Sequence, residues 1–156
     1  MAKELLSYIA GFLDGDGCIM LQLVRRKDYV YGFQIRASIV FYQKQKHRVF
    51  LEWLQKQFQV GYIRNRNDGM SEYTIVGFKS VTKVLKKLKP FLRLKKKHVN
   101  LVFKVDKIFS KGFSVDKLLK ASKYVDEFLD INYSKKRTNT SKELEQFLKN
   151  QKLISP

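Results

Sequence analysis

The sequence contains few of the residues that build disulfides and zinc sites. Cys18 is its one cysteine, which excludes an internal disulfide and fits a reducing compartment. The two histidines, His47 and His98, are not accompanied by a CxxC pair, so the donors of a structural zinc site are missing. No apolar run reaches about 18 residues, and we therefore expect no transmembrane helix.

Acidic residues are also scarce. The 156 residues include 14 Asp and Glu against 32 Lys and Arg, which gives a net charge of +18. Such a surplus implies a polyanionic partner, either nucleic acid or an anionic membrane. On charge alone, a basic ribosomal or chromatin protein remains an alternative. The apolar fraction of 44% is sufficient for a folded core, and the length suits a single domain covering 1–156.

Two pairs of segments alternate between apolar and polar residues, which indicates half-buried strands. The first pair covers about 19–24 and 34–42, and the charged and aromatic stretch 25–32 between them predicts a long hairpin loop or ribbon tip. The second pair, 61–66 and 72–76, flanks Asn67-Asp68-Gly69, and Asp-Gly in that position is a strong hairpin signal. Two such hairpins can join in one antiparallel sheet that has one face covered by helices and one face open.

Helical spacing of apolar residues predicts helices at about 5–14, 46–58, 79–89 and 94–109. Trp53 lies within the apolar stripe of 46–58 and is interpreted as a core residue, and Pro90 ends the helix at 79–89. Two C-terminal helices are expected at about 115–129 and 141–150, the second with Ser141 as its N-cap. The order helix, two strands, helix, two strands, helices predicts an α+β fold.

Strand parity predicts which side chains share the open face of the sheet. This set mixes donors, acceptors and apolar groups, which suits direct reading of base edges in a DNA major groove, where Arg pairs with guanine and Gln with adenine. An ordinary solvated face would carry more Lys and Glu. The basic clusters 95–97 and 135–137 suit phosphate contacts instead. The predicted DNA-binding residues are Met20, Gln22, Val24, Arg26, Asp28, Gln34, Arg36, Ser38, Val40, Tyr42, Tyr62, Arg64, Arg66, Glu72, Thr74 and Lys135.

The stretch Ile9-Ala10-Gly11-Phe12-Leu13-Asp14-Gly15-Asp16-Gly17 is an apolar helix end that runs into two acids alternating with two glycines. Glycine inside a helix costs about 1 kcal/mol, so Ala10 and Gly11 indicate a close helix–helix contact. The helix is expected to stop near residues 14–15, because glycine commonly follows a helix end. Asp16 would then stand just past the negative end of the helix dipole, where a carboxylate favours a bound cation such as Mg²⁺.

Residues 9–17 resemble the LAGLIDADG motif of homing endonucleases. Three further segments, Gly61-Tyr62-Ile63-Arg64, Pro90-Phe91-Leu92-Arg93-Leu94-Lys95 and Asn132-Tyr133-Ser134-Lys135, resemble the single-motif, homodimeric I-CreI type, and the similarity extends from about Leu5 to about Phe147. The resemblance implies an αββαββα core with a saddle-shaped antiparallel sheet and additional C-terminal helices. It also implies a double-strand DNA endonuclease that hydrolyses a long, pseudo-palindromic site, leaves staggered ends and mobilises the intron that encodes it.

The resemblance also implies roles for individual residues. The last acid of the family motif binds metal, a role that carries over to Asp16, with the Gly15 carbonyl as a further metal contact. Gln43 matches a glutamine that organises solvent, and Lys95 matches a lysine near the scissile phosphate. His47 stands where the family has Arg or Lys, and it departs from the pattern because histidine is only partly charged near neutral pH.

A single chain contains one copy of the motif, whereas holding two metal ions at a cleavage site requires more than one carboxylate. A two-fold dimer across the motif helix would bring two copies of Asp16 together, one for each DNA strand. By resemblance, the dimer interface contains Ala10, Gly11, Leu13 and Asp14, and Asp14 caps or orients the helix pair. Mg²⁺ is the expected cofactor, Mn²⁺ is expected to substitute for it, and Ca²⁺ is expected to bind without supporting cleavage. The family implies an intracellular location, in the chloroplast or mitochondrion that encodes the intron.

Two alternatives share the implied fold. An RNA-splicing maturase would use it to bind RNA, and a nuclease-dead regulator would bind DNA without cutting. The presence of both Asp14 and Asp16 favours a nuclease but does not exclude RNA binding.

Overall fold

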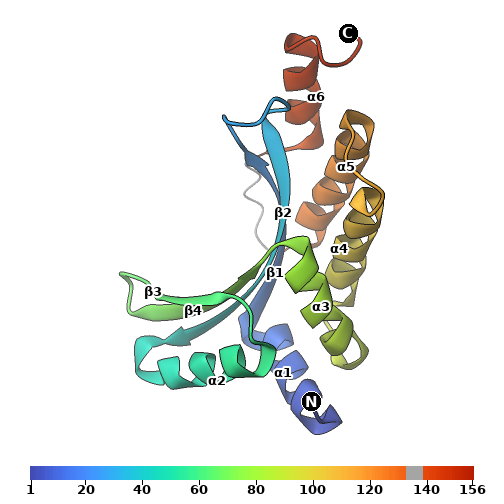
Figure 1. The fold of residues 1–156 in the computed structure, drawn as a ribbon. Coiled ribbons are helices and arrows are strands. Elements are labelled where there is room, and N and C mark those ends of the chain that lie inside the picture. Colours follow the sequence, from blue (N-terminus) through green and yellow to red (C-terminus); the bar gives the residue numbers. More distant parts are fainter. Residues whose placement is uncertain (133–138) are drawn as a thin grey trace. The chain divides into compact units, whose positions relative to one another are not determined.

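The computed structural model describes residues 1–132 and 139–156, and its ribbon is drawn in Figure 1. The chain divides into two compact units whose segments interleave along the sequence. Unit 1 consists of Met1–Met20 and Ala37–Val99, and unit 2 consists of Leu21–Arg36 and Asn100–Pro156. The single domain expected from the sequence stays a prediction.

The helices and strands follow the predicted αββαββα order and continue into C-terminal helices, so the α+β fold is confirmed. In chain order the elements are α1 (Lys3–Asp16), β1 (Gly17–Arg25), β2 (Phe33–Lys44), η1 (Gln45–His47), α2 (Arg48–Phe58), β3 (Tyr62–Asn65), β4 (Met70–Val76), α3 (Phe78–Leu88), η2 (Lys89–Phe91), α4 (Lys96–Phe109), α5 (Val115–Ile131) and α6 (Ser141–Asn150).

The four strands form one sheet in the order β1-β2-β4-β3. Within unit 1, β4 pairs antiparallel with both β2 and β3, so that Phe41 lies opposite Tyr73 and Ile39 opposite Ile75. These four side chains are fully buried, and they mark the helix-covered face of the sheet. The side chains predicted to face the core therefore do so along the paired parts of β2 and β4, although several residues of the opposite parity are buried as well, so that burial itself does not alternate there.

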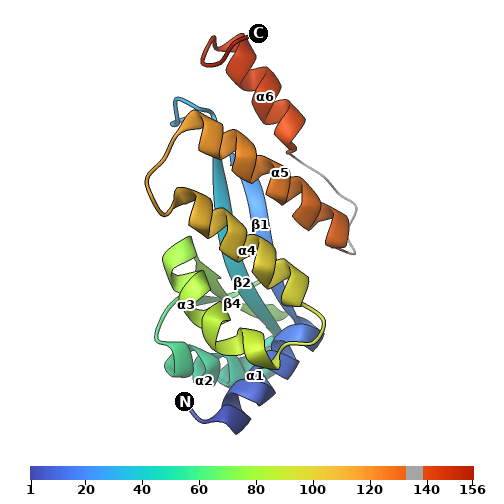
Figure 2. The same cartoon turned by 90° about the vertical axis from the view of Figure 1, so that its right-hand side faces the viewer.

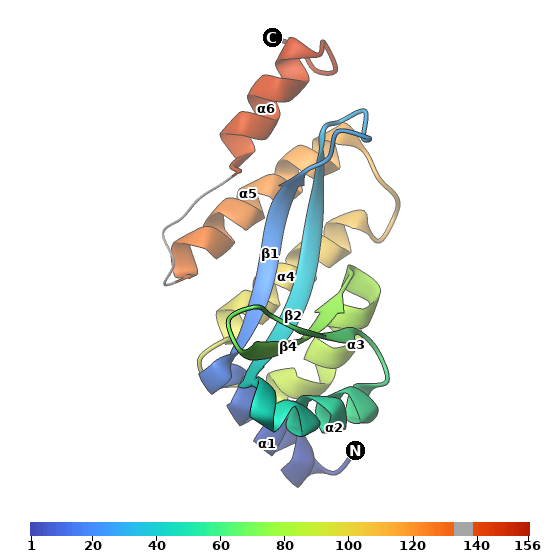
Figure 3. The ribbon, with the colours of Figure 1, turned by 90° about the vertical axis from the view of Figure 1, so that its left-hand side faces the viewer.

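Three helices of unit 1 cover that face. α2 and α3 both contact β4, and α1 contacts α3. Their inward side chains are almost completely shielded from water, and each contributes roughly 1.5–3 kcal/mol by leaving it. Figure 3 shows α1 leading directly into β1, which places the end of the acidic motif at the start of a strand. The buried helix residues are Ile9, Leu13, Leu51, Leu54, Val81 and Leu85.

The end of α1 differs from the prediction. The helix does not stop near residues 14–15 but continues to Asp16, and Gly17 is its C-cap. The Gly17 N–H donates to the Leu13 carbonyl, and a Cβ at Gly17 would stand 2.6 Å from Leu13 Cδ1. Glycine is therefore required at residue 17, whereas a Cβ at Gly15 would meet nothing within 4 Å. Asp16 is the last helical residue instead of the first residue beyond the helix.

Unit 2 contains α5, α6, most of α4 and the outer parts of β1 and β2. Figure 2 shows α4 and α5 side by side, and the ammonium of Lys104 lies 5.4 Å from the centroid of the Tyr124 ring between them. α5 begins at an N-cap, Ser114, whose hydroxyl accepts from Lys117 N–H. The N-cap of α6 is Thr140, which forms a capping box with Glu143, so the predicted N-cap, Ser141, is wrong by one residue.

Candidate active site and nucleic-acid interface

Asp14 is buried at the C-terminal end of α1 and is held by backbone groups that precede α4. One carboxylate oxygen accepts from Arg93 N–H at 2.6 Å and from Leu94 N–H at 3.2 Å, and the other accepts from Lys95 N–H at 3.1 Å. These bonds explain why α4 begins at Lys96 and not at the predicted residue 94. They also place a negative charge at the positive end of α4. Asp14 thus joins α1 to the segment that leads into α4.

Lys95 completes this junction. Its ammonium donates to the Asp14 carbonyl oxygen at 2.6 Å, which is a carbonyl of the last turn of α1. A cation is favourable at that end of a helix, where the last carbonyls lack intrahelical partners. Lys95 also lies close enough to Cys18 to oppose, in part, the burial that raises the pKa of that thiol. The predicted catalytic lysine therefore stands at the end of the acidic motif.

Asp16 is exposed at the end of the same helix. Among residues 1–132 and 139–156, its carboxylate forms no hydrogen bond or ion pair, although the chain carries a net charge of +18. Gly15 is exposed as well. A carboxylate and a backbone carbonyl are the oxygen donors that Mg²⁺ prefers, so these residues fit a divalent cation. No group of three or more Asp, Glu, His or Cys that could hold a metal occurs within the described part of the chain.

Gln43 and His47 lie where β2 ends and α2 begins. Gln43 is half-buried on β2 opposite Ser71 of β4, and His47 is exposed at the end of η1, where it is the N-cap of α2. Arg48 follows His47, yet its guanidinium is already bound to Glu52 at 3.0 Å and to Asn65 at 2.6 Å. Arg48 therefore does not supply a free positive charge in place of the Arg or Lys that the resemblance implies at position 47.

The predicted dimer-interface residues fall on two sides of α1. Ala10, Leu13 and Asp14 are buried within this chain, while Gly11 is exposed. Ser7, Gly11 and Gly15 follow each other at four-residue spacing and share the exposed side of the helix. A Cβ at Gly11 would meet nothing within 4 Å. The interface stays a prediction, and Gly11 is the one of the four residues that reaches the exposed side of α1.

The register of unit 1 brings the predicted reading residues into rows. Val40 and Tyr62 lie on either side of Thr74, and Tyr42 and Arg64 lie on either side of Glu72. Residues directly opposite each other in a sheet share a face. The residues from the two hairpins are therefore brought onto one face, as parity predicted, and within unit 1 they lie opposite the helix-covered side.

This face is less open than parity implied. Ser38, Val40, Glu72 and Thr74 are only 3–8% exposed. They belong to the two central strands, β2 and β4, whose side chains are flanked on both sides, so longer neighbours cover them. The prediction that these four residues are exposed on the open face is therefore wrong. The exposed part of this face consists mainly of arginines and tyrosines, and the buried residues lie beneath them.

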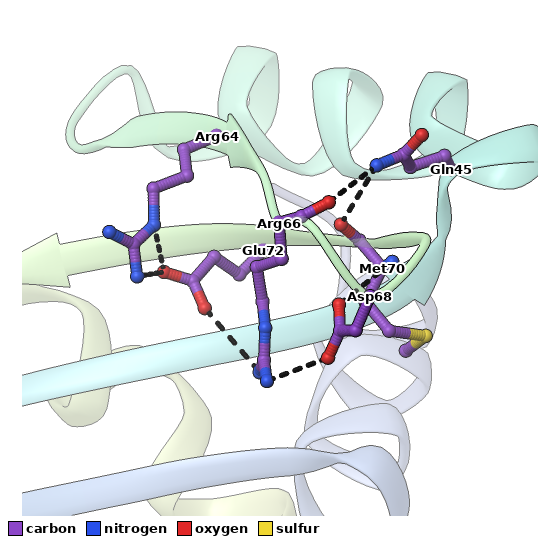
Figure 4. Close-up of polar contacts among 6 residues, drawn as sticks. All are labelled: Gln45, Arg64, Arg66, Asp68, Met70 and Glu72. Atoms are coloured by element: carbon purple, nitrogen blue, oxygen red, sulfur yellow. Dashed lines mark hydrogen bonds and ion pairs between the residues drawn. The ribbon is translucent and has the colours of Figure 1, made fainter.

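Glu72 organises the arginines of this face. Its carboxylate binds the Arg64 guanidinium at 2.7 Å and approaches Arg66 at 3.9 Å, and Arg66 also pairs with Asp68 at 2.8 Å (Figure 4). Gln45 supports the turn by donating to the Arg66 carbonyl at 2.8 Å. The two guanidiniums are thus held at fixed positions above the sheet, a pairing that strand parity alone did not reveal.

Tyr42 lies beside this network. Burial raises the pKa of the Tyr42 hydroxyl, the negative charge of Glu72 adds to the rise, and the nearby arginines oppose it. The hydroxyl therefore remains a hydrogen-bond donor over the physiological pH range.

The ribbon tip of unit 2 carries a second polar cluster. Arg26 donates to Gln34 Oε1 at 2.9 Å and binds Asp28 through two nitrogens. These bonds hold the pKa of Asp28 below its ordinary value. Arg36 donates to Gln22 at 3.3 Å along the same ribbon. These even-numbered residues thus bond to one another, which strand parity did not predict, and Arg26 and Asp28 lie in the loop beyond β1.

Residues 9–109 match the family described as LAGLIDADG endonuclease. The chain belongs to the LAGLIDADG endonuclease family. It is 39% identical over 140 residues to DNA endonuclease I-CreI of Chlamydomonas reinhardtii, covering 89% of this chain and 85% of that protein. It is 36% identical over 143 residues to DNA endonuclease I-CvuI of Chlorella vulgaris, covering 92% of this chain and 89% of that protein.

The LAGLIDADG fold is also shown by solved structures. The crystal structure of I-CvuI with the I-CreI target and 2 mM Mg, in which the DNA is not cleaved, superposes with a TM-score of 0.93 at 34% identity and covers 97% of each chain. A second I-CvuI complex, with its target and 2 mM Ca, gives a TM-score of 0.92.

Lys135, predicted to contact DNA, lies outside the described residues. Each helix in 1–132 and 139–156 is too short or too polar to cross a bilayer.

Proposed function

We propose that this LAGLIDADG protein is a site-specific DNA endonuclease that cuts both strands of its target as a homodimer. The observation that carries the proposal is the exposed Asp16 carboxylate, which no described residue of the chain binds, at the point where the motif helix runs into a strand of the sheet. A buried structural acid would need a partner. An exposed acid without one, in so basic a chain, is suited to a ligand that arrives from outside.

The sheet reads the DNA sequence. A strand of nine residues such as β1 is about 30 Å long, the length of roughly nine base pairs. Arg26, Arg64 and Arg66 keep guanidinium N–H groups beyond those used in their ion pairs, and we propose that these donate to guanine, while Gln22 and Gln34 suit adenine. Two copies related by a two-fold axis would therefore recognise a long, pseudo-palindromic site. Lysines outside the sheet would bind phosphates without reading the sequence.

Asp16 and the Gly15 carbonyl would hold a divalent cation, with the second Asp16 supplied by the partner copy. The chemistry that Mg²⁺ would supply when held there is polarisation of the scissile phosphate and stabilisation of the leaving oxygen. Mn²⁺ is proposed to substitute, and Ca²⁺ to bind without supporting cleavage. Both metals that accompany the I-CvuI structures, Ca and Mg, belong to this class of oxygen-binding cation.

The remaining site residues act on charge and solvent. Lys95, fixed by its bond to the Asp14 carbonyl at 2.6 Å, places a positive charge beside the end of the motif for the phosphate to approach. Gln43 donates and accepts hydrogen bonds and would orient the attacking water, with His47 as a further polar group. Each chain would cut one strand, and the two cuts would leave staggered ends.

The biological role that we propose is homing of the intron that encodes the enzyme, in a chloroplast or mitochondrion. The basis is the resemblance to intron-encoded relatives of this type, and the location is part of the same proposal.

The decisive experiment is a cleavage selection. Wild type and Asp16→Asn are incubated with a randomised duplex library in Mg²⁺, and the cut ends are sequenced. A two-fold-related consensus cut by wild type alone is the expected result. Cutting by both proteins at equal rates would remove Asp16 from the mechanism. Binding of structured RNA with no cutting of DNA would replace the proposal by an RNA-splicing role, and binding of DNA with no cutting by a regulatory one.

A further inference from the structure

Arg25, the last residue of β1, joins three segments of unit 2. Its guanidinium donates from Nη1 to the Gly32 carbonyl at 2.8 Å. Its Cζ lies 4.9 Å from the centroid of the Phe33 ring and 4.2 Å from that of the Phe147 ring. The two rings meet edge to face at 5.7 Å. We name Arg25, Gly32, Phe33 and Phe147 the α6 clamp, because they attach α6 to both strands of the ribbon.

Gly32 is fitted closely into this clamp. Its φ is +70°, a conformation that favours glycine, and an added Cβ would stand 2.1 Å from Arg25 Nη1 and 2.4 Å from Phe147 Cε1. Its carbonyl accepts from Arg26 N–H at 2.8 Å as well as from Arg25. Gly32 therefore links the clamp to the turn that carries the tip.

The tip residues on the other side of the ribbon are the predicted base readers. Arg26 follows Arg25 directly, and its side chain reaches Gln34 and Asp28 instead of α6. Its guanidinium lies 4.8 Å from the centroid of the Tyr29 ring. Because adjacent residues at a strand end point to opposite sides, anything that fixes Arg25 also fixes the backbone from which Arg26 projects.

α6 is itself anchored to the ribbon at a second point. Asn139, just before the helix, donates from Nδ2 to the Leu23 carbonyl at 2.8 Å, and β1 is an edge strand with carbonyls available for such a contact. Leu144 and Leu148 are fully buried, and Ser141 N–H donates to Asp126 of α5 at 3.0 Å. The helix that supplies Phe147 is therefore a fixed support.

We propose that the α6 clamp positions the ribbon tip, so that Arg25 and Phe147 sharpen sequence discrimination at the base pairs read by Arg26 and Gln34 without contacting them. The proposal rests on the proposed DNA endonuclease function. The clamp residues are positioning residues. They act by restricting the orientations of the tip, so their loss lets Arg26 and Gln34 accept the wrong base more readily.

The test compares Phe147→Leu, which preserves charge, with Arg25→Met and Arg25→Lys, and uses Lys120→Met on the exposed side of α5 as a control for lost charge. Cleavage of the best site and of every single-base-pair variant is measured as kcat/KM, together with thermal unfolding. We expect discrimination at the tip-read positions to fall about two- to fivefold in Phe147→Leu and Arg25→Met, the factor of one exposed cation–π contact. Discrimination near the cut should be unchanged, and Arg25→Lys should retain most of it.

Each outcome separates the two proposals. Wild type that neither binds nor cuts DNA would overturn the endonuclease function and with it this inference. Wild type that is active, with Phe147→Leu giving the same profile, would overturn the clamp alone. An equal loss at all positions, or the same loss in Lys120→Met, would assign the effect to stability or charge and would also overturn it. If Phe147→Leu unfolds, Arg25→Met at an exposed position decides the matter.

Discussion

Asp14 and Asp16 occupy opposite sides of the last turn of α1. Positions two residues apart in a helix are separated by about 200° around the axis. Asp14 therefore faces the core, where three backbone N–H groups bind it, and Asp16 faces outward, where no described residue does. Two residues of the same type in the same motif thus differ in their surroundings: the fold binds Asp14 with its own backbone, and Asp16 remains available for the cation that we propose.

The sharpest test of this difference is Asp16→Asn. Because the amide cannot supply the charge that holds a cation, we expect cleavage of the target to fall at least about a thousandfold, while DNA binding persists. Thermal stability should not fall, since the carboxylate forms no hydrogen bond or ion pair with the described residues, and removing a negative charge from the C-terminal end of a helix is favourable.

Isothermal titration of Mg²⁺ or Ca²⁺ into the DNA complex, with and without the substitution, gives a readout independent of cutting. Equal heats of metal binding in the two proteins would mean that Asp16 does not hold the metal. Chelation by EDTA should stop wild-type cleavage and leave the unfolding temperature of the free protein unchanged.

Asp14→Ala should, in contrast to Asp16→Asn, lower the stability of the fold. It leaves the N–H groups of Arg93, Leu94 and Lys95 without their acceptor, and we expect the free energy of unfolding to fall by about 3 kcal/mol, or roughly 6–12 °C in unfolding temperature. Asp14→Asn, which retains one oxygen acceptor, should lose about half of this. Urea unfolding of both variants measures the effect. An unfolding free energy within error of wild type would contradict the role of Asp14 in joining α1 to α4.

The sequence predicted features that depend on neighbouring residues better than contacts between distant segments. The period-two alternation located the strands, and Asn67-Asp68-Gly69 located a hairpin, because these signals are local. The partners of Asp14 are about eighty residues away in the sequence, and backbone N–H groups leave no residue-type signature, so no pattern could name them. The α6 clamp could not be predicted for the same reason, because Phe147 and Arg25 are far apart in the sequence. Glycine at two nearby positions made the end of α1 ambiguous, and only the contact of Gly17 with Leu13 decides it.

Gly11 extends the comparison along the exposed side of α1. Gly11→Leu has room in a single chain, because nothing lies within 4 Å of an added Cβ. If this side packs closely on a second copy, the larger side chain should weaken dimerisation about tenfold without lowering the unfolding temperature of the chain.

Sedimentation equilibrium across a range of protein concentrations measures the dimer constant. Lys86→Leu on the exposed side of α3 is the matched control, because it adds an apolar side chain away from α1. Gly11→Ala should raise helix stability by about 0.5–1 kcal/mol in either case. A dimer constant unaffected by Gly11→Leu would place the interface elsewhere.

The smallest expected effect concerns Cys18, which follows both acids and lies near Lys95. Burial raises the pKa of its thiol, and Lys95 partly offsets that rise. The thiolate is the reactive form, so at pH 8 iodoacetamide should modify folded Cys18 more slowly than a free cysteine, and Lys95→Met should slow it further. Because the folded-state pKa is the higher one, the protonated thiol stabilises the fold below the ordinary cysteine pKa, and this contribution is lost as the pH rises through the folded-state value. Faster alkylation in Lys95→Met would mean that Lys95 acts at this helix end as a cover over Cys18 and not through its charge.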